Sequence, residues 1–138
     1  MTKSIHRVFL SLGSNLSDRQ AHLNKAIELI GERIGEVVRQ SSFIETEPWG
    51  FESENRFLNG AILVETTLTP RQLLKATQKI ERELGRKRKS SSGVYHDRPI
   101  DIDILLYDDL TIDEPDLKIP HPLMHERDFV MIPLREIQ

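Results

Sequence analysis

Two aspartates alternate with isoleucines in the segment Arg98-Pro99-Ile100-Asp101-Ile102-Asp103-Ile104-Leu105. Alternation with a period of two is typical of a β-strand, so Asp101 and Asp103 are expected on one face and the isoleucines on the other. Two residues of strand rise separate the two Cα atoms by about 6.5–7 Å. Like charges on one face repel each other and need compensation. Two magnesium ions about 3.5–4 Å apart fit this geometry, and the segment predicts a metal-dependent phosphate-transfer site.

A dense basic run, Arg86-Lys87-Arg88-Lys89, shortly precedes the aspartates. Taken alone, such a run is typical of a solvated helix end, where the last carbonyl groups favour cations. Here it opens a polar loop, residues 86–98, that leads directly to Asp101 and is long enough to act as a lid. Arginines on such a loop can clamp phosphate oxygens and stabilise the charge of a phosphoryl group during transfer.

The composition excludes several classes of function. The 138 residues suit one domain, residues 1–138, and the chain has no cysteine, which excludes disulfides and thiolate zinc sites. A net charge of −3 does not favour nucleic acid, and no apolar run approaches the ~20 residues of a membrane span. The N-terminus lacks the apolar core of a signal peptide, so a cytoplasmic location and a monomer are the default expectations.

A zinc site is a weaker alternative. His121 and His125 are four residues apart, a spacing that binds zinc when both lie on one helix. Pro122 disfavours a regular helix from His121, and no third ligand stands out in the sequence.

The chain reads as alternating strands and helices. Gly13-Ser14-Asn15 predicts a turn after the first strand, and Ser17 with Gln20 predicts a capping box at the start of the first helix. Thr69-Pro70-Arg71-Gln72 predicts the start of the second helix, which Gly85 ends. The C-terminal part, rich in proline, is expected to be mostly loop and short helix. In order, the expected elements are strand 7–12, helix 17–34, strand 37–46, strand 57–64, helix 69–84, strand 100–107 and a short returning strand 110–112 that pairs with it.

This order predicts an α+β fold of the ferredoxin-like type, an antiparallel sheet with both helices packed on one face. If the isoleucine face of strand 100–107 meets the helices, the aspartates lie on the opposite face, and Phe57 and Asn59 lie there by the same alternation. Together with Trp49, Phe51 and Phe129, they are candidates for a flat pocket that stacks a planar heterocycle, with Asn59 recognising its polar edge.

Six motifs, in order and nearly end to end, resemble those of the 6-hydroxymethyl-7,8-dihydropterin pyrophosphokinase family of the folate pathway. The run from Arg98 to Ile104, followed downstream by Pro-His-Pro, is highly specific to that family. The motifs are Leu12-Gly13-Ser14-Asn15-Leu16, Thr46-Glu47-Pro48-Trp49-Gly50, Phe57-Leu58-Asn59, Glu81-Arg82-Glu83-Leu84-Gly85-Arg86, Arg98-Pro99-Ile100-Asp101-Ile102-Asp103-Ile104 and Ile119-Pro120-His121-Pro122.

The resemblance implies transfer of pyrophosphate from ATP to the hydroxymethyl group of the dihydropterin, with release of AMP. It implies two Mg²⁺ ions on Asp101 and Asp103, and catalytic arginines, Arg86 and Arg88, that close over the phosphates. By the same matching, ATP contacts fall on Gln78, Glu81, Arg88, Arg98, Ile104, His121 and Arg127, and pterin contacts on Thr46, Trp49, Phe57, Asn59, Tyr95 and Phe129. ATP and the pterin are thus the expected partners, without nucleic acid or membrane.

Departures from the family pattern affect two positions. The loop between Lys89 and Arg98 is longer than in some relatives, which leaves the Tyr95 match open, and Pro122 stands where some members have tyrosine. No nucleophile accompanies the aspartates, which favours direct in-line attack by the pterin hydroxyl on ATP. Two rivals remain open: an RNA-binding module on the same sheet, and a nucleotidyltransferase that transfers AMP and releases pyrophosphate.

Overall fold

The computed structural model describes residues 4–15, 18–46, 56–85 and 100–138. Its main sheet has the strand order β2-β4-β1-β5, with the short strand β3 also paired to β4, and every pairing in it is antiparallel. The predicted ferredoxin-like arrangement is therefore confirmed. The elements are β1 His6–Ser14, α1 Arg19–Arg33, β2 Gly35–Gln40, β3 Ile44–Thr46, β4 Phe57–Thr66, α2 Pro70–Glu83, β5 Asp101–Tyr107, β6 Ile112–Glu114, β7 Leu117–Ile119, the 3₁₀ turn η1 Met124–Glu126 and α3 Asp128–Ile137.

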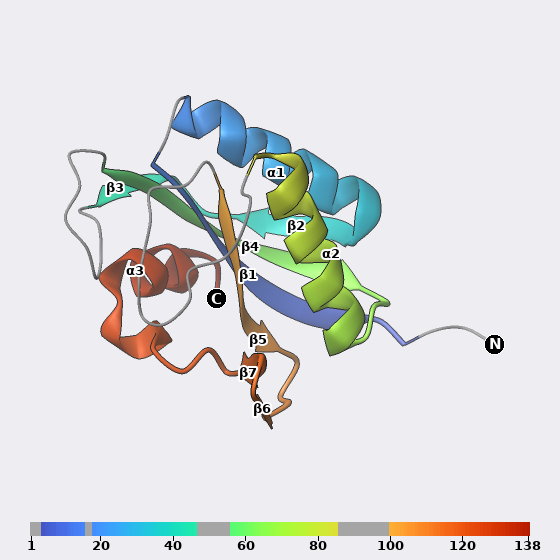
Figure 1. The fold of residues 1–138 in the computed structure, drawn as a ribbon. Helices are drawn as coiled ribbons and strands as arrows, with labels where there is room; N and C mark the ends of the chain where they lie inside the picture. The colour runs from blue at the N-terminus through green and yellow to red at the C-terminus, as the bar shows by residue number, and fades with distance from the viewer. Residues whose placement is uncertain (1–3, 16–17, 47–55, 86–99) are drawn as a thin grey trace.

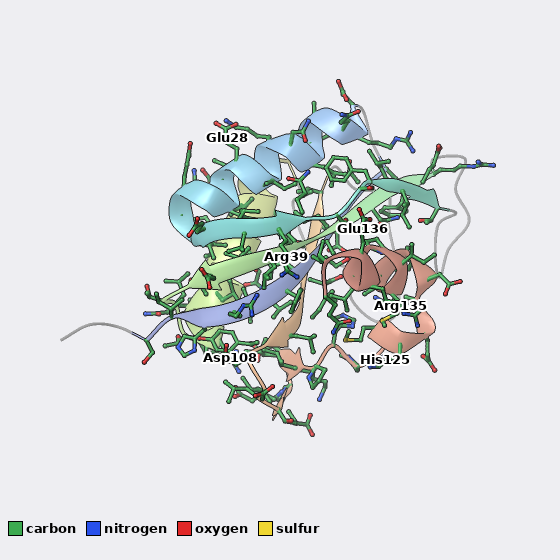
Figure 2. All side chains as sticks on the ribbon, turned by 180° about the vertical axis from the view of Figure 1, so that it is seen from behind. Glu28, Arg39, Asp108, His125, Arg135 and Glu136 are labelled. Carbon is green, nitrogen blue, oxygen red and sulfur yellow. The ribbon has the colours of Figure 1, made fainter. Side chains whose placement is uncertain are left out.

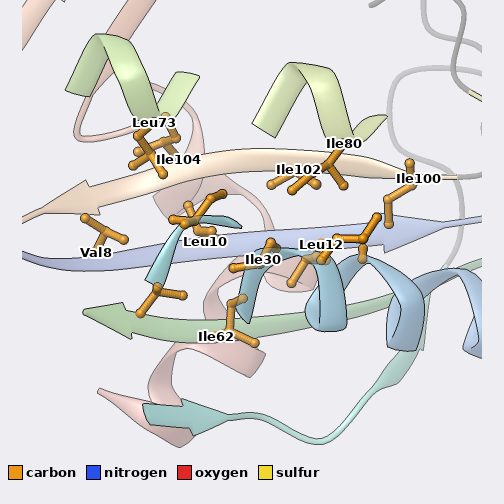
Figure 3. Packing of buried hydrophobic residues seen from close by; sticks show 14 of the residues in the cluster. Val8, Leu10, Leu12, Ile30, Ile62, Leu73, Ile80, Ile100, Ile102 and Ile104 are labelled. Atoms are coloured by element: carbon orange, nitrogen blue, oxygen red, sulfur yellow. The ribbon is translucent and has the colours of Figure 1, made fainter. Parts of the chain in front are cut away.

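Helices α1 and α2 pack on one face of the sheet, and α3 lies on the other (Figure 1). The main core fills the space under α1 and α2, where alternate residues of β1, β4 and β5 meet the apolar stripes of the helices (Figure 3). Ile30, Ile62 and Ile80, one from α1, one from β4 and one from α2, are each 0% exposed. Burying such a side chain stabilises the fold by about 1.5–3 kcal/mol, so this layer holds both helices against the sheet.

The second helix begins as predicted. The Thr69 hydroxyl accepts a hydrogen bond from Gln72 N, and the Gln72 side chain accepts one from Thr69 N, which completes the capping box. After the last turn, Gly85 has φ 105°, a left-handed conformation that glycine adopts without steric cost.

The capping prediction for the first helix is wrong by one residue. The N-cap is Asp18, whose carboxylate accepts from Ala21 N at 3.1 Å, and not Ser17. Asp and Ser are comparable N-caps, and the helix begins with the second of these two adjacent residues.

Strand β5 departs from strict alternation after Ile104. In the register with β1, Phe9 pairs with Leu106 while Leu10 pairs with Ile104, so one residue of β5 is extra. This β-bulge leaves Leu105 and Leu106 on the α3 side and returns Tyr107 to the core under α1 and α2. Both faces of the strand are therefore apolar at this end, and the acidic stretch is confined to its first three residues.

One expectation for the C-terminal part is wrong, whereas the short helix expected there is present. Residues 110–112 do not return along β5; Ile112 begins β6, which pairs with β7 in a separate two-stranded sheet. The end of the chain is a ten-residue helix, α3, with Pro133 inside it. A proline in a helix costs about 3 kcal/mol, but Val130, Leu134 and Ile137 are buried on this helix, and their burial offsets that cost.

Helix α3 is also tied to the sheet by polar contacts. Arg39 of β2 donates to Ile137 O at 3.0 Å, and the hydroxyl of Ser42 donates to the Glu136 carboxylate at 2.8 Å. Figure 2, seen from behind, places Arg39 and Glu136 on the side where α3 crosses the sheet. Within the described residues, no helix has the length and apolar character that a membrane crossing needs.

The packing of α2 on the sheet yields a stability prediction. Ile80→Ala should destabilise the fold by about 2–5 kcal/mol in urea unfolding, because it opens a cavity between α2 and the isoleucines of β5. Lys79→Ala, at an exposed position of the same helix, is the matched control and should change stability by no more than about 0.5 kcal/mol. Equal effects of the two substitutions would contradict this view of the core.

Candidate active site

The acidic pair lies on the face of β5 that α1 and α2 do not cover. Ile102 and Ile104 are buried in the core under those helices, whereas Asp101 and Asp103, which alternate with them, are partly exposed. The predicted shared face of the two aspartates is therefore confirmed. β5 is the last strand of the sheet, so the pair sits at an edge that a ligand can reach from the side.

Gly13 lies between the acidic pair and Asn59. It pairs with Asp101 of β5 on one side and with Asn59 of β4 on the other. Neighbouring strands are about 4.8 Å apart, so the Cα atoms of Asp101 and Asn59 are separated by roughly 10 Å with only a glycine between them. The expected turn at Gly13 is wrong, because Gly13 and Ser14 both belong to β1.

The missing side chain of Gly13 leaves room for its neighbours. A Cβ atom there would lie 2.7 Å from Asn59 Oδ1 and 3.5 Å from the Phe57 ring. The Asn59 amide therefore lies across β1, toward the acidic pair, and its Nδ2 donates to the Thr46 hydroxyl at 2.6 Å. Three of the predicted pterin contacts are thus neighbours: Phe57 and Asn59 lie over Gly13, and Thr46 is hydrogen-bonded to Asn59.

A pocket of about 280 Å³ opens at the free edge of β5. Its walls come from three parts of the chain: the exposed side of α2, the backbone edge of β5, and the β6–β7 hairpin with the segment after it. Four sequence-predicted residues are among those that line it, namely Gln78, Asp103, Ile104 and His121. The other lining residues were not predicted as site residues: Leu74, Ile102, Pro115, Asp116, Leu117, Lys118 and Pro122.

His121 is held beside the acidic pair by the main chain. Its backbone N–H donates to Leu105 O at 3.0 Å, and its Nδ1 lies 3.4 Å from Leu123 N. When Nδ1 accepts that contact, Nε2 is the ring nitrogen left to donate to an anion. His125 is exposed and lies in η1, whereas His121 precedes that turn, so the two histidines do not share a regular helix as the zinc spacing would require. Among the residues the structure describes, no group of three or more His, Cys, Asp or Glu could hold a metal.

Arg127 and Phe129 lie together at the start of α3. The Arg127 guanidinium carbon is 5.6 Å from the centre of the Phe129 ring, a cation–π distance, and Phe129 packs against the cluster that contains Leu105. The resemblance implies an ATP contact for Arg127 and a pterin contact for Phe129, and the structure places these two side chains against each other.

An ion-pair network orients the hairpin wall of the pocket. Arg71, on the first turn of α2, forms ion pairs with Glu114 and Asp116 of the hairpin region. The Arg71 guanidinium lowers the pKa of Asp116, and the hydrogen bonds to Glu114 and Asp116 raise the pKa of Arg71. All three side chains are well exposed, so the network directs the hairpin more than it stabilises the fold.

Glu81, for which the resemblance implies an ATP contact, lies in a buried position on α2. It is 2% exposed, and its carboxylate accepts a hydrogen bond from Ile102 N at 2.8 Å. The remaining predicted site residues, Trp49, Arg86, Arg88, Tyr95 and Arg98, lie outside the described residues.

The donors present fit magnesium. Two carboxylates that project from one strand are the hard oxygen ligands that Mg²⁺ prefers, and Mg²⁺ is commonly held by one or two carboxylates plus substrate phosphates and water. Small residues of β1, Gly13 and Ser11, pair with Asp101 and Asp103.

Comparison with known proteins agrees with these features. Residues 9–138 match the model of the family described as 7,8-dihydro-6-hydroxymethylpterin-pyrophosphokinase (HPPK). A 2-amino-4-hydroxy-6-hydroxymethyldihydropteridine pyrophosphokinase of Porphyromonas gingivalis is 53% identical over 131 residues, 94% of this chain and 89% of that protein. An Aquifex aeolicus protein of the same name is 44% identical, over 95% of this chain and 79% of that protein.

A solved structure shows the same fold. The Plasmodium falciparum HPPK-DHPS wild type with STZ-DHP aligns with TM-score 0.79 at 16% identity. The alignment covers 97% of this chain and 40% of that one, so the chain spans about two fifths of that larger protein.

The role of Gly13 can be tested without any ligand. Gly13→Ala should displace the Asn59 amide and break its bond to Thr46, at a cost of about 1–3 kcal/mol in stability. The change should appear in the NMR signal of the Asn59 side-chain amide. Gly31→Ala is the control: nothing lies within 4 Å of its new Cβ, and it should stabilise α1 by about 0.5–1 kcal/mol. An unchanged Asn59 signal in Gly13→Ala would refute the contact.

Proposed function

The chain belongs to the 7,8-dihydro-6-hydroxymethylpterin-pyrophosphokinase family, and we propose that it transfers the pyrophosphate of ATP to 6-hydroxymethyl-7,8-dihydropterin with release of AMP. As a family member it is a pyrophosphokinase of folate biosynthesis that uses ATP. The proposal extends to the metal ions, to the roles of single residues and to the way the transfer proceeds.

One observation carries the proposal: the acidic pair separates two differently built regions. On the side of β1 and β4 lie Asn59 and Phe57, an amide and a ring suited to a flat, polar-edged heterocycle. At the free edge of β5 lies the pocket lined by Gln78, Asp103 and His121. A transfer enzyme needs such an arrangement, because the two substrates must meet at the groups that neutralise charge.

Asp101 and Asp103 are the residues that would hold Mg²⁺. When bound, the metal would neutralise phosphate charge and make the pterin hydroxyl more acidic. The two carboxylates determine where the phosphate charge would be neutralised. Their own positions are fixed because their strand is paired on one side with β1 and covered on its other face by α2.

The other residues orient and bind. Thr46 fixes the Asn59 amide, so that the amide can recognise the edge of the pterin without reorganising. His121, with its proton on Nε2, donates to an ATP phosphate, and Gln78 contacts the nucleoside. Arg86, Arg88 and Arg98 supply further positive charge by their match to the family. Phosphoryl chemistry needs mainly positioning and charge stabilisation, so direct in-line attack needs no enzyme nucleophile.

Product analysis tests the reaction. Incubation with ATP, Mg²⁺ and 6-hydroxymethyl-7,8-dihydropterin should release AMP in step with the pterin diphosphate. Release of inorganic pyrophosphate instead would identify a nucleotidyltransferase. A phosphorylated enzyme trapped by rapid quenching would refute the direct transfer.

Substitution of the acidic pair tests the proposed metal-binding role. Asp101→Ala and Asp103→Ala should each abolish AMP release and leave the circular dichroism spectrum and unfolding midpoint close to those of the wild type, since both side chains are partly exposed. Asp109→Ala, at an exposed position after β5, is the control and should retain activity. Full turnover in either of the first two variants would remove the metal-binding role.

Two further substitutions test whether the proposed pterin and ATP regions are separate. Asn59→Ala should weaken pterin binding about tenfold or more, because it removes a buried polar partner, and should leave affinity for an ATP analogue unchanged. His121→Ala should weaken binding of the ATP analogue and leave pterin affinity unchanged. Isothermal titration calorimetry with each ligand measures both constants. Parallel losses of both affinities in both variants would show that the two regions are not separate.

A further inference from the structure

Glu81 contacts the backbone of β5 between the two aspartates. It sits in the last turn of α2, and its Oε2 accepts from Ile102 N at 2.8 Å. Ile102 is the residue between Asp101 and Asp103, and its side chain is buried in the core. A buried carboxylate is therefore hydrogen-bonded at the centre of the acidic stretch.

This contact gives a backbone N–H of β5 the acceptor that a neighbouring strand would otherwise provide. Among the strands that the structure describes, β5 is paired with β1 only, and its outer edge needs other acceptors and donors. The Glu81 carboxylate serves Ile102 N, and the main-chain N–H of His121 serves Leu105 O on the same strand. The edge next to the acidic pair is thus held by fixed groups from α2 and from the segment after β7.

The residue type is informative. The other buried positions of α2 are Leu73, Thr77 and Ile80, and packing alone would favour a similar residue at position 81. A buried carboxyl group needs hydrogen-bond partners, and the amide of Ile102, between the two aspartates, is one of them. Because side chains alternate with the pleat, the backbone at Ile102 determines the directions of both flanking aspartates.

We propose that Glu81 is a positioning residue, which fixes the direction and spacing of the Asp101 and Asp103 carboxylates by holding the amide between them. The inference rests on the proposed function of those aspartates as metal-binding residues. It assigns Glu81 a role through the protein backbone, in place of the direct ATP contact expected from the family resemblance. Misplacement of a reacting group by about 1 Å costs on the order of 10² in rate, so a modest rotation at Ile102 has a large effect.

Two substitutions separate the possibilities. Glu81→Gln retains the shape and one acceptor oxygen, whereas Glu81→Leu fills the space without an acceptor; Glu81→Ala is the second variant if leucine prevents folding. The ligand-free readout is hydrogen exchange of the Ile102 amide by NMR. The binding readout is the affinity for Mn²⁺, by electron paramagnetic resonance, in the presence of a non-hydrolysable ATP analogue, alongside affinity for the pterin alone.

Loss of the acceptor should speed Ile102 exchange, weaken Mn²⁺ binding about tenfold or more and lower kcat on the order of 10²-fold, with pterin affinity within about twofold. Glu81→Gln, which keeps an acceptor, should retain most of the wild-type Ile102 protection, Mn²⁺ affinity and kcat. Wild-type Mn²⁺ affinity in a folded Glu81→Leu or Glu81→Ala would overturn the proposal. So would a Glu81→Gln that keeps slow Ile102 exchange but loses affinity for the ATP analogue alone, which indicates a direct nucleotide contact.

These outcomes remain distinguishable from failure of the proposed function. Asp101→Asn serves as the reference: if it binds Mn²⁺ as the wild type does, the aspartates are not metal-binding residues. If Asp101→Asn loses Mn²⁺ and the acceptor-free Glu81 variant does not, only the positioning role of Glu81 is refuted.

Discussion

Strand β5 is apolar on one face and carries two carboxylates on the other within seven residues, and the rest of the structure depends on this division. One face supplies Ile102 and Ile104 to the core, and the other presents two carboxylates that the core could not accept. The edge position of the strand makes this possible, because the acidic side stays accessible. The bulge after Ile104 then ends the acidic stretch and lets Leu105 join the apolar cluster under α3.

The neighbouring strand, β1, is divided in a similar way between its two faces. β1 is the inner strand between β4 and β5, and its even-numbered residues fill the core while its odd-numbered positions opposite the aspartates are small. At Gly13 there is no side chain at all, and the Asn59 amide occupies the space. The pairing of a buried amide with Thr46 makes that space rigid, which suits recognition of a flat ligand.

The C-terminal quarter of the chain completes the site from outside the sheet. The β6–β7 hairpin walls the pocket at the edge of β5, and Arg71 on α2 orients it through its ion pairs. Helix α3 carries Phe129 and Arg127 to the other face of the same strand. Each of these pieces is positioned by contacts with β5 or with the elements that pack on it, so the acidic strand is the common reference for both binding regions.

Much of this protein was determined by local sequence. Alternation placed the aspartates opposite the isoleucines, and the capping box at Thr69 began α2 at the right residue, because both signals are local. The order of strands and helices was enough for the fold class. The specific motifs were enough for the family, which periodicity alone would not have identified.

Tertiary structure decided what local patterns leave open. The bulge in β5, the pairing of β6 with β7 and the burial of a helix containing Pro133 follow from which surfaces meet, and no local signal encodes that. Gly13 looked like a turn because only the register reveals that Asn59 lies over it. The hydrogen bond from the amide of Ile102 to Glu81 likewise follows from tertiary structure, because only the packing of α2 against β5 brings that carboxyl group to the outer edge of the strand.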